Sequence, residues 1–142
     1  MTPPTFPSRP PAHTLRPFFA PRGVAVIGAS QTPGKLGHSV VANLRRFGYA
    51  GAVYPVNPRA PSILGLPCYP DIARVPDPVD LALIIVPAPA TPALVQACGE
   101  RGIPAVTVMS GGFAETGDSG AARQVELVRI AREYGMRLVG PN

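Results

Sequence analysis

The sequence predicts an α/β fold: a Rossmann-like, doubly wound domain with a mainly parallel five-stranded sheet and helices on both faces. Three observations favour this class. Short apolar runs rich in β-branched residues alternate with segments of helical spacing. The first run passes through a turn of small residues directly into a helical segment. The 142 residues, of which 46% are hydrophobic and 15% charged, suit one soluble globular domain.

The expected elements alternate along the chain. Strands are expected over residues 24–28, 52–56, 81–86, 105–109 and 137–139, and helices over 36–47, 91–101 and 121–134. A loop over 60–70 and a single helical turn over 71–75 are expected before the third strand. Because apolar strands alternate with helices of about 10–15 residues, the strands are expected to pair in parallel through βαβ units.

Single residues support several of these elements. Gly48 follows the first helix, where glycine commonly ends helices. Pro55 indicates an edge strand or a short strand, because proline cannot donate to a neighbouring strand. Thr91 is expected to cap the second helix, with Pro92 at the first helical position. In the last helix, the stripe expected to face the core is Val125, Val128, Ala131 and Tyr134.

The first residues form a separate compositional segment. Seven of the twenty prolines fall within residues 1–21, so a disordered proline-rich tail is expected over 1–13 and the folded body over 14–142. Residues 14–19 carry enough apolar bulk to dock on the body as one helical turn. The longest apolar run, 81–86, is far too short to span a membrane, so no membrane partner is expected.

The charge and the cysteines narrow the choice of partner. The net charge of +5 favours an anionic partner, but the basic residues are scattered and tryptophan is absent, which argues against nucleic acid. Cys68 and Cys98 have no metal-ligand spacing and no disulfide framework around them, so no metal site is expected. Both are interpreted as reduced packing residues of a cytoplasmic protein.

The first strand, its turn and the following helix predict a phosphate site. Gly28, Ala29 and Ser30 form the turn, and small residues let a phosphate approach the backbone. The helix that starts near Leu36 presents unpaired N–H groups and a partial positive charge. Lys35 stands at this start, where a cation is unfavourable for the helix itself, and this indicates an anionic ligand.

Two familiar phosphate motifs do not fit. A P-loop needs four residues between its glycines and Ser or Thr after the lysine, whereas five residues separate Gly28 from Gly34 and Leu36 follows Lys35. An NAD site needs an acidic residue after the second strand, and this chain has Asn57, Pro58 and Arg59 there. Arg59 is either a ligand for a ribose phosphate, which both NADP and coenzyme A (CoA) carry, or a solvated loop residue.

Seven short motifs occur in an order that resembles a known family. Together they resemble the N-terminal CoA-binding domain of the nucleoside-diphosphate-forming acyl-CoA synthetases, the superfamily of the succinyl-CoA synthetase alpha subunit and the ADP-forming acetate–CoA ligases. The resemblance covers about residues 15–142. The motifs are Gly28-Ala29-Ser30, Tyr54-Pro55-Val56-Asn57-Pro58, Gly65-Leu66-Pro67-Cys68-Tyr69, Val79-Asp80-Leu81-Ala82, Val86-Pro87-Ala88-Pro89, Ser110-Gly111-Gly112-Phe113 and Gly140-Pro141-Asn142.

The resemblance implies a role for each loop. The turn 28–30 and the stretch to Lys35 would hold the CoA diphosphate, and Arg59 would lie near the ribose phosphate beside Asn57 and Pro58. Val86, Pro87 and Ala88 would line the pantetheine, and Ser110, Gly111 and Gly112 would lie near the thiol. Purely structural roles remain open for Ser30, Lys35, the prolines after the third strand and the two glycines, and His38 is expected to pack or hydrogen-bond locally.

The family's chemistry needs parts that this chain lacks. The resemblance implies a second ligase domain, with a histidine that is transiently phosphorylated, and a nucleotide-grasp domain or subunit. No residue here matches that histidine, so no catalytic residue is assigned and residues 1–142 are expected to be inactive alone. The end on Gly140-Pro141-Asn142 favours a truncation before the second domain. A synthetase fragment, an acetyltransferase fusion, a free-standing CoA sensor and an NADP-binding redox domain all stay open.

Overall fold

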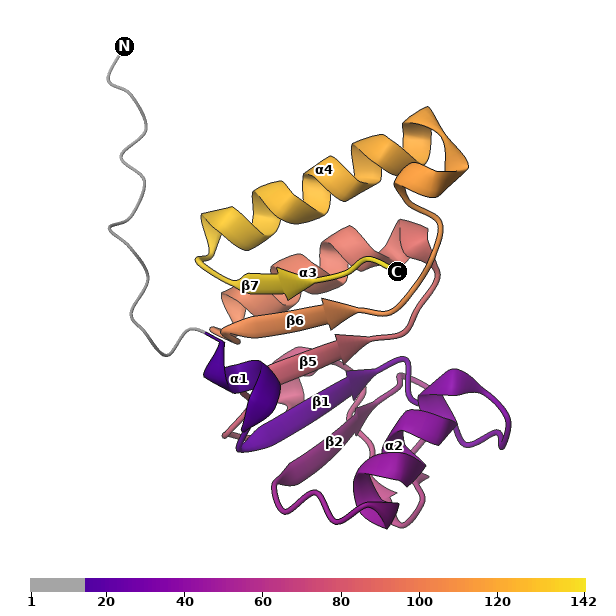
Figure 1. Ribbon diagram of the computed structural model, residues 1–142. Helices are drawn as coiled ribbons and strands as arrows, with labels where there is room; N and C mark the ends of the chain where they lie inside the picture. The colour runs from indigo at the N-terminus through magenta and orange to yellow at the C-terminus, as the bar shows by residue number, and fades with distance from the viewer. Residues whose placement is uncertain (1–14) are drawn as a thin grey trace.

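The computed structural model describes residues 15–142, so the tail expected over 1–13 lies outside the described part. Its centre is a five-stranded sheet in the order β2-β1-β5-β6-β7, in which every neighbouring pair is parallel (Figure 1). The strands are β1 (Gly23–Ile27), β2 (Ala52–Val56), β5 (Leu81–Ile84), β6 (Ala105–Val108) and β7 (Arg137–Val139). This confirms the predicted class, and β2 is the edge strand that its proline indicated.

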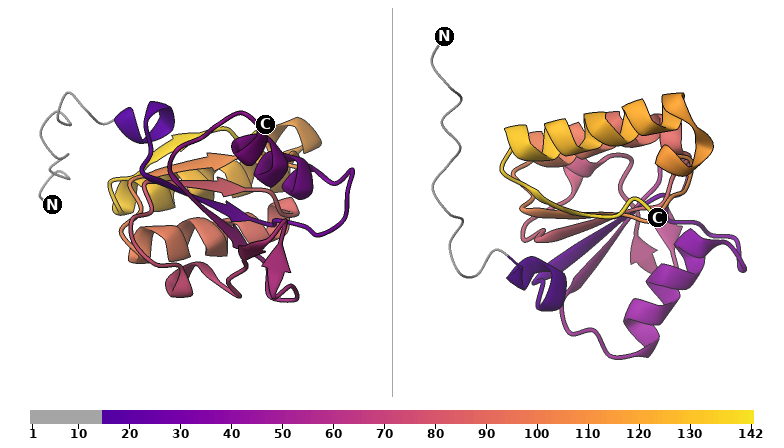
Figure 2. Two further views of the ribbon diagram at one scale, coloured as in Figure 1. Left: turned by 90° about the horizontal axis from the view of Figure 1, so that it is seen from below. Right: turned by 45° about the horizontal axis from the view of Figure 1, so that its top comes forward.

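Helices cover both faces of the sheet. α3 (Thr91–Glu100) and α4 (Asp118–Glu133) lie on one face, and α2 (Leu36–Arg46) lies on the other (Figures 1 and 2). The four-residue α1 (Arg16–Phe19) packs on the face of α2 through Phe18, as expected for a single docked turn. No helix within residues 15–142 is both long enough and apolar enough to cross a membrane.

The buried apolar run of β1 fits its position as an inner strand of the sheet. All five residues of β1 are buried, because alternate side chains contact α3 and α4 on one face and α2 on the other. Ile27 belongs to the core between the sheet and helices α3 and α4. Val24 and Val26 belong to the core on the other face, together with Val41 of α2. Burying one such side chain contributes about 1.5–3 kcal/mol to the stability of the fold. Successive side chains of a strand point to opposite faces, so a continuous apolar run is fully buried only where helices cover both faces of the sheet.

The connection from β2 to β5 contains more structure than a loop. Residues expected to be irregular form an antiparallel hairpin of β3 (Ser62–Ile63) and β4 (Leu66–Pro67), with Leu64 and Gly65 at positive φ in the turn. Ile63 is 1% exposed and anchors the hairpin in the core on the α2 side. The expected helical turn is present as the 3₁₀ helix η1 (Ile72–Arg74).

The cap predicted for α3 is wrong. Thr91 is already the first residue of α3, and its side chain caps no helix N–H. Its hydroxyl instead donates to the carbonyl oxygen of Ala88 at 2.7 Å, within the 3₁₀ helix η2 (Ala88–Ala90) that precedes α3. Thr91 is fully buried, so this bond satisfies a hydroxyl that could not reach water.

The apolar stripe predicted for α4 is wrong in part. Ala131 is buried against the sheet as predicted, but Val125 is 70% exposed, and the other residues of α4 in this core are Leu127 and Ile130. α4 also begins at Asp118, three residues before the expected start. Both stripes have helical spacing, so the pattern could not choose between them and the packing position of the helix decided. In α2, Val41 is buried with Val40 and Leu44 packed beside it, whereas Phe47, just after the helix, is 75% exposed.

Candidate ligand-binding site

The loops predicted to bind a ligand lie side by side at one edge of the sheet. They follow β2, β1, β5 and β6, which are neighbours in this order, and parallel strands end at the same edge. The chain's C-terminus lies at this edge too (Figure 1). We name it the carboxyl edge; it comprises residues 28–35, 57–59, 86–88 and 110–112.

The turn after β1 depends on two glycines. Gly28 has φ +93°, and a Cβ there would lie 2.0 Å from the carbonyl oxygen of Ile85. A Cβ on Gly37 would lie 2.1 Å from the carbonyl oxygen of Gly28, so the first turn of α2 packs directly on this turn. The positive end of the helix is thereby held at the carboxyl edge. Sequence reasoning gave Gly37 no role, although a glycine in a first helical turn was a usable signal.

Ser30 and His38 stabilise the same turn from within. The Ser30 hydroxyl accepts a hydrogen bond from the N–H of Thr32 at 3.0 Å. The carbonyl oxygen of Ser30 lies 3.1 Å from Nδ1 of His38, and because a carbonyl only accepts, Nδ1 is the donor. His38 therefore forms a local hydrogen bond, as expected. Ser30 stabilises the turn through both its hydroxyl and its carbonyl oxygen.

Asn57 connects the end of β2 with this turn. Its amide Nδ2 donates to the carbonyl oxygen of Ala29 at 2.8 Å, and its Oδ1 accepts from the backbone N–H of Arg59, also at 2.8 Å. Ala29 is buried, whereas Pro58 and Arg59 are exposed. Asn57 thus has a clear structural function, and its hydrogen bonds set the backbone from which Arg59 projects.

Lys35 and Arg59 are cations without a partner among the residues that the structure describes. Within residues 15–142, neither side chain makes a hydrogen bond or an ion pair, and both are exposed. Lys35 is the N-cap residue of α2 and does not cap it with its side chain, and the first turn of α2 holds no acidic residue. Within residues 15–142, no carboxylate therefore neutralises the two cations on the loops after β1 and β2.

The loops after β5 and β6 are joined to each other. The Ser110 hydroxyl donates to the carbonyl oxygen of Val86. Gly112 has φ +102°, and a Cβ there would lie 2.9 Å from the Cβ of Ala88, which is buried. Pro87 and Gly111 are exposed between these contacts. The two loops therefore form one surface rather than two independent segments.

Two residues outside the predicted set hold the backbone of Gly112. Its N–H donates to Oε1 of Glu115 at 2.5 Å, and its carbonyl oxygen accepts from Nη1 of Arg123 at 2.8 Å. The N–H groups of Gly112, of Phe113 and of Glu115 itself hold the pKa of the Glu115 carboxyl below its usual range. The sequence pattern could not predict the role of Arg123, because its side chain, on α4, bonds a residue eleven positions earlier in the chain.

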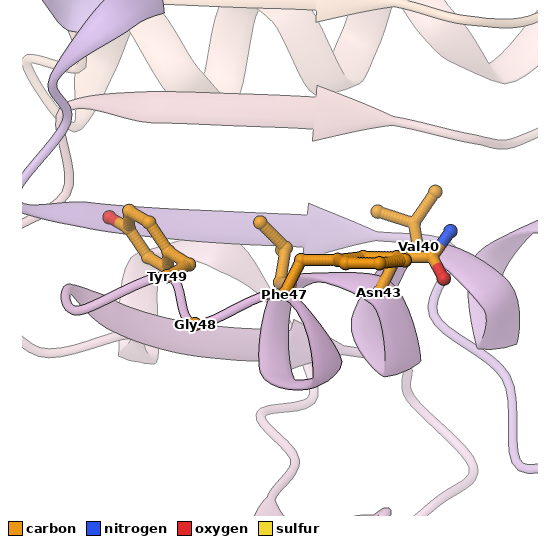
Figure 3. Close-up of a pocket in the computed structure, with 6 residues that line it drawn as sticks. Val40, Asn43, Phe47, Gly48 and Tyr49 are labelled. Atoms are coloured by element: carbon orange, nitrogen blue, oxygen red, sulfur yellow. The ribbon is translucent and has the colours of Figure 1, made fainter.

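One hollow of the structure lies away from these loops. A pocket of about 370 Å³ lies along the last turn of α2 and the connection to β2, away from the carboxyl edge (Figure 3). Its lining is mostly apolar and comprises Val40, Asn43, Leu44, Phe47, Gly48 and Tyr49. None of these lining residues carries a positive charge that would favour a phosphate. Within residues 15–142, no cluster of three His, Cys, Asp or Glu side chains is placed to hold a metal ion.

The fold and the carboxyl edge define a class of protein. The chain goes from β1 to β2 on one side and then returns to β5 on the other side of β1, so the strand order reverses at β1. A glycine turn with a helix start packed on it lies at this point, beside the cations Lys35 and Arg59. This arrangement is typical of Rossmann-like domains that bind a phosphate-bearing nucleotide. The chain belongs to the CoA-binding domain family, whose profile matches residues 22–142. It is thus the CoA-binding type of this fold, as the seven ordered motifs indicated.

Known relatives agree with this assignment. The chain is 47% identical over 128 residues to the ADP-forming acetate–CoA ligase II of Archaeoglobus fulgidus. It is 46% identical over 125 residues to the alpha subunit of the ADP-forming acetate–CoA ligase II of Pyrococcus furiosus. Among solved structures, the apo form of the dinucleotide-forming acetyl-coenzyme A synthetase 1 of Ca. Korarchaeum cryptofilum matches with a TM-score of 0.86 and 43% identity.

These relatives are much longer than the chain. The matches cover 90%, 88% and 90% of the chain, but only 19%, 27% and 28% of the respective relatives. The chain therefore corresponds to the CoA-binding part of ADP-forming acetate–CoA ligases.

Proposed function

We propose that CoA lies along the carboxyl edge, with its diphosphate at the turn after β1 and its pantetheine across the loops after β5 and β6. The residues of this proposed site are Gly28, Ala29, Ser30, Lys35, Asn57, Pro58, Arg59, Val86, Pro87, Ala88, Ser110, Gly111 and Gly112. The site follows the order of the strands, so one elongated ligand contacts all four loops.

The pair of unneutralised cations carries this proposal. CoA bears two separate anionic groups, a diphosphate and a ribose phosphate, and the carboxyl edge offers Lys35 and Arg59 on two separate loops. Asn57 stands where an NAD site would have a carboxylate, so the end of β2 does not repel a ribose phosphate. A close approach to the turn fits as well, because Gly28 has no side chain and Gly34 has no atom within 4 Å of its Cβ position.

The other two loops suit the thin, mostly apolar pantetheine. Pro87 is exposed and donates no backbone hydrogen bond, so it offers an apolar wall. Gly111 is exposed, and a Cβ there would meet only Glu115 Oε1 at 3.4 Å, which leaves the backbone open to a ligand. The hydroxyl of Ser110 is already used by Val86, so we assign Ser110 to shaping the channel rather than to direct chemistry.

The domain is proposed to act within a larger acyl-CoA synthetase. Its relatives are acetate–CoA ligases of which it spans less than a third, and the Pyrococcus relative is one subunit of its enzyme. We assign the acyl transfer and nucleotide chemistry to downstream ligase and nucleotide-grasp parts. Incubated with acetate, ATP and CoA, the 142-residue chain alone is expected to form no acetyl-CoA.

Calorimetric titration of the 142-residue chain tests the proposed ligand. CoA is expected to bind with micromolar or better affinity, and NADP is expected to bind far more weakly. The two ligands share an adenosine and a diphosphate, but CoA carries its ribose phosphate at the 3′ position and NADP at the 2′ position, and only CoA has a pantetheine. The comparison therefore tests the ribose-phosphate and pantetheine ends of the site together. Equal affinity for both, or a preference for NADP, would contradict the proposed course of the ligand along the loops after β5 and β6.

A further inference from the structure

The amide groups on both sides of Gly112 are held by charged side chains. Glu115 accepts from the N–H at 2.5 Å, and Arg123 donates to the carbonyl oxygen at 2.8 Å. The two charges come from different elements: Glu115 lies in the 3₁₀ helix η3 (Ala114–Thr116), and Arg123 lies in α4. The loop after β6 is thus clamped between its own continuation and a helix of the outer layer.

The contact of Arg123 differs from those of another arginine on α4. Arg129 pairs with Glu126 and Glu133, both at 2.7 Å, in exposed ion pairs typical of a helix surface. Arg123 is half-buried and donates to a backbone carbonyl eleven residues earlier in the chain. A charge-assisted bond to a loop carbonyl restrains the loop, and it contributes little to helix α4 itself.

Gly112 lies in close contact with the loop after β5, so a small movement of its backbone would shift the two loops relative to each other. Gly112 has φ +102°, and its Cα lies so close to the buried Ala88 that a Cβ would approach the Ala88 Cβ to 2.9 Å. Ser110, two residues earlier, is bonded to Val86. The position of Gly112 therefore sets the spacing between the loops after β5 and β6, which is the width of the proposed pantetheine channel.

We infer that Arg123 is a positioning residue, which with Glu115 fixes Gly112 and thereby preforms the pantetheine end of the CoA site. This inference rests on the proposed function. Arg123 contacts the loop backbone rather than the ligand path, so it acts through Gly112. Within residues 15–142, Lys35 and Arg59, at the proposed adenosine end of the site, form no hydrogen bond or ion pair with Glu115 or Arg123.

Two ligands separate this role from a general structural one. CoA occupies the whole proposed site, whereas adenosine 3′,5′-bisphosphate occupies only the adenosine end. Arg123→Met keeps the aliphatic stem and removes the hydrogen bond. It is expected to weaken CoA about fivefold to tenfold, which is less than the loss of a direct charge-assisted bond to the ligand because Arg123 acts through Gly112, and to leave the bisphosphate unchanged. Arg123→Lys, which retains a charged donor, is expected to restore most of the CoA affinity.

Arg129→Met is the matched control, because it removes an arginine from the same helix without touching the loop. It is expected to change neither affinity. If Arg123→Met weakens both ligands equally, or neither, the positioning role is overturned while CoA binding by the unmodified chain still stands. If the unmodified chain binds the bisphosphate no better than inorganic phosphate and does not bind CoA, the proposed function and this inference are both overturned.

Discussion

The side-chain amide of Asn57 donates to the carbonyl oxygen of Ala29 at 2.8 Å, which joins the end of β2 to the turn after β1. The same side chain accepts from the N–H of Arg59. One residue therefore positions both the proposed diphosphate turn and the loop that carries the proposed contact to the ribose phosphate. These two regions are 28 residues apart in the chain and adjacent in the sheet.

Replacing Asn57 is expected to affect stability and binding together. Asn57→Ala removes two hydrogen bonds worth about 1 kcal/mol each, so the free energy of unfolding should fall by about 1–2 kcal/mol and CoA should bind more weakly. Urea unfolding and calorimetry measure the two effects. Gln31→Ala is the control, since it removes an exposed amide bond to the Ser62 carbonyl oxygen. A loss no larger than that of the control would refute the linking role.

Arg59 is expected to recognise the ribose phosphate. Arg59→Ala should weaken CoA by about 1.5–3 kcal/mol, which is roughly a 10-fold to 150-fold rise in Kd, because a charge-assisted bond is lost. Dephospho-CoA lacks that phosphate, so its affinity should hardly change. Arg132→Ala, at an exposed arginine near the end of α4, removes the same charge elsewhere. An equal loss for both ligands would remove the proposed role of Arg59.

The two glycines around the phosphate turn should differ in their tolerance of a side chain. Both have positive φ, +93° at Gly28 and +88° at Gly34, so alanine costs about 1–2 kcal/mol of backbone strain at either position. At Gly28 the new Cβ also meets the Ile85 carbonyl oxygen at 2.0 Å, whereas nothing lies within 4 Å at Gly34. In urea unfolding, Gly28→Ala should therefore be clearly less stable than Gly34→Ala. Similar losses would mean that the Gly28 turn does not pack closely on β5.

The ion pair between Arg22 and Asp80 predicts that the stability of the fold decreases at acidic pH. Hydrogen bonds from Arg22 to Asp80, at 2.8 and 2.9 Å, hold the pKa of the Asp80 carboxyl below its ordinary value of 3.8. A lowered pKa stabilises the fold above pH 3.8, and this contribution is lost as the pH falls through the lowered pKa.

Asp80→Asn should lower the free energy of unfolding near neutral pH by about 1 kcal/mol, a modest value because solvent screens the exposed Arg22. The difference from the unmodified protein should disappear well below pH 3.8, where both carry a neutral residue. Thermal unfolding over a pH series measures this. A difference that persists in acid would mean that packing, rather than charge, is lost.

The two cysteines should react at different rates. Cys98 is fully buried, and burial raises the pKa of its thiol to about 12. Cys68 is only half-buried, although burial raises the pKa of its thiol too. Because the thiolate is the reactive form, iodoacetamide at mildly alkaline pH should modify Cys68 slowly and Cys98 only after unfolding, as mass spectrometry of digests would show. Modification of native Cys98 before Cys68 would contradict the buried position of α3.

The local pattern of the chain was enough to predict the class of fold. Strand and helix positions follow from the spacing of apolar side chains, and Pro55 marked β2 as an edge because a missing N–H is a property of the residue itself. The seven ordered motifs also identified the CoA-binding family, which the match over residues 22–142 confirms. The individual contacts with CoA stay predictions.

Contacts between distant residues were decided only by the tertiary structure. α4 carries two apolar stripes, and packing on the sheet selected the one with Leu127 and Ile130. The bond of Asn57 to Ala29 and that of Arg123 to Gly112 form because the sheet brings separate loops together. Periodicity reports the environment of a residue along its own element, whereas a hydrogen bond between elements depends on where the whole chain places both partners.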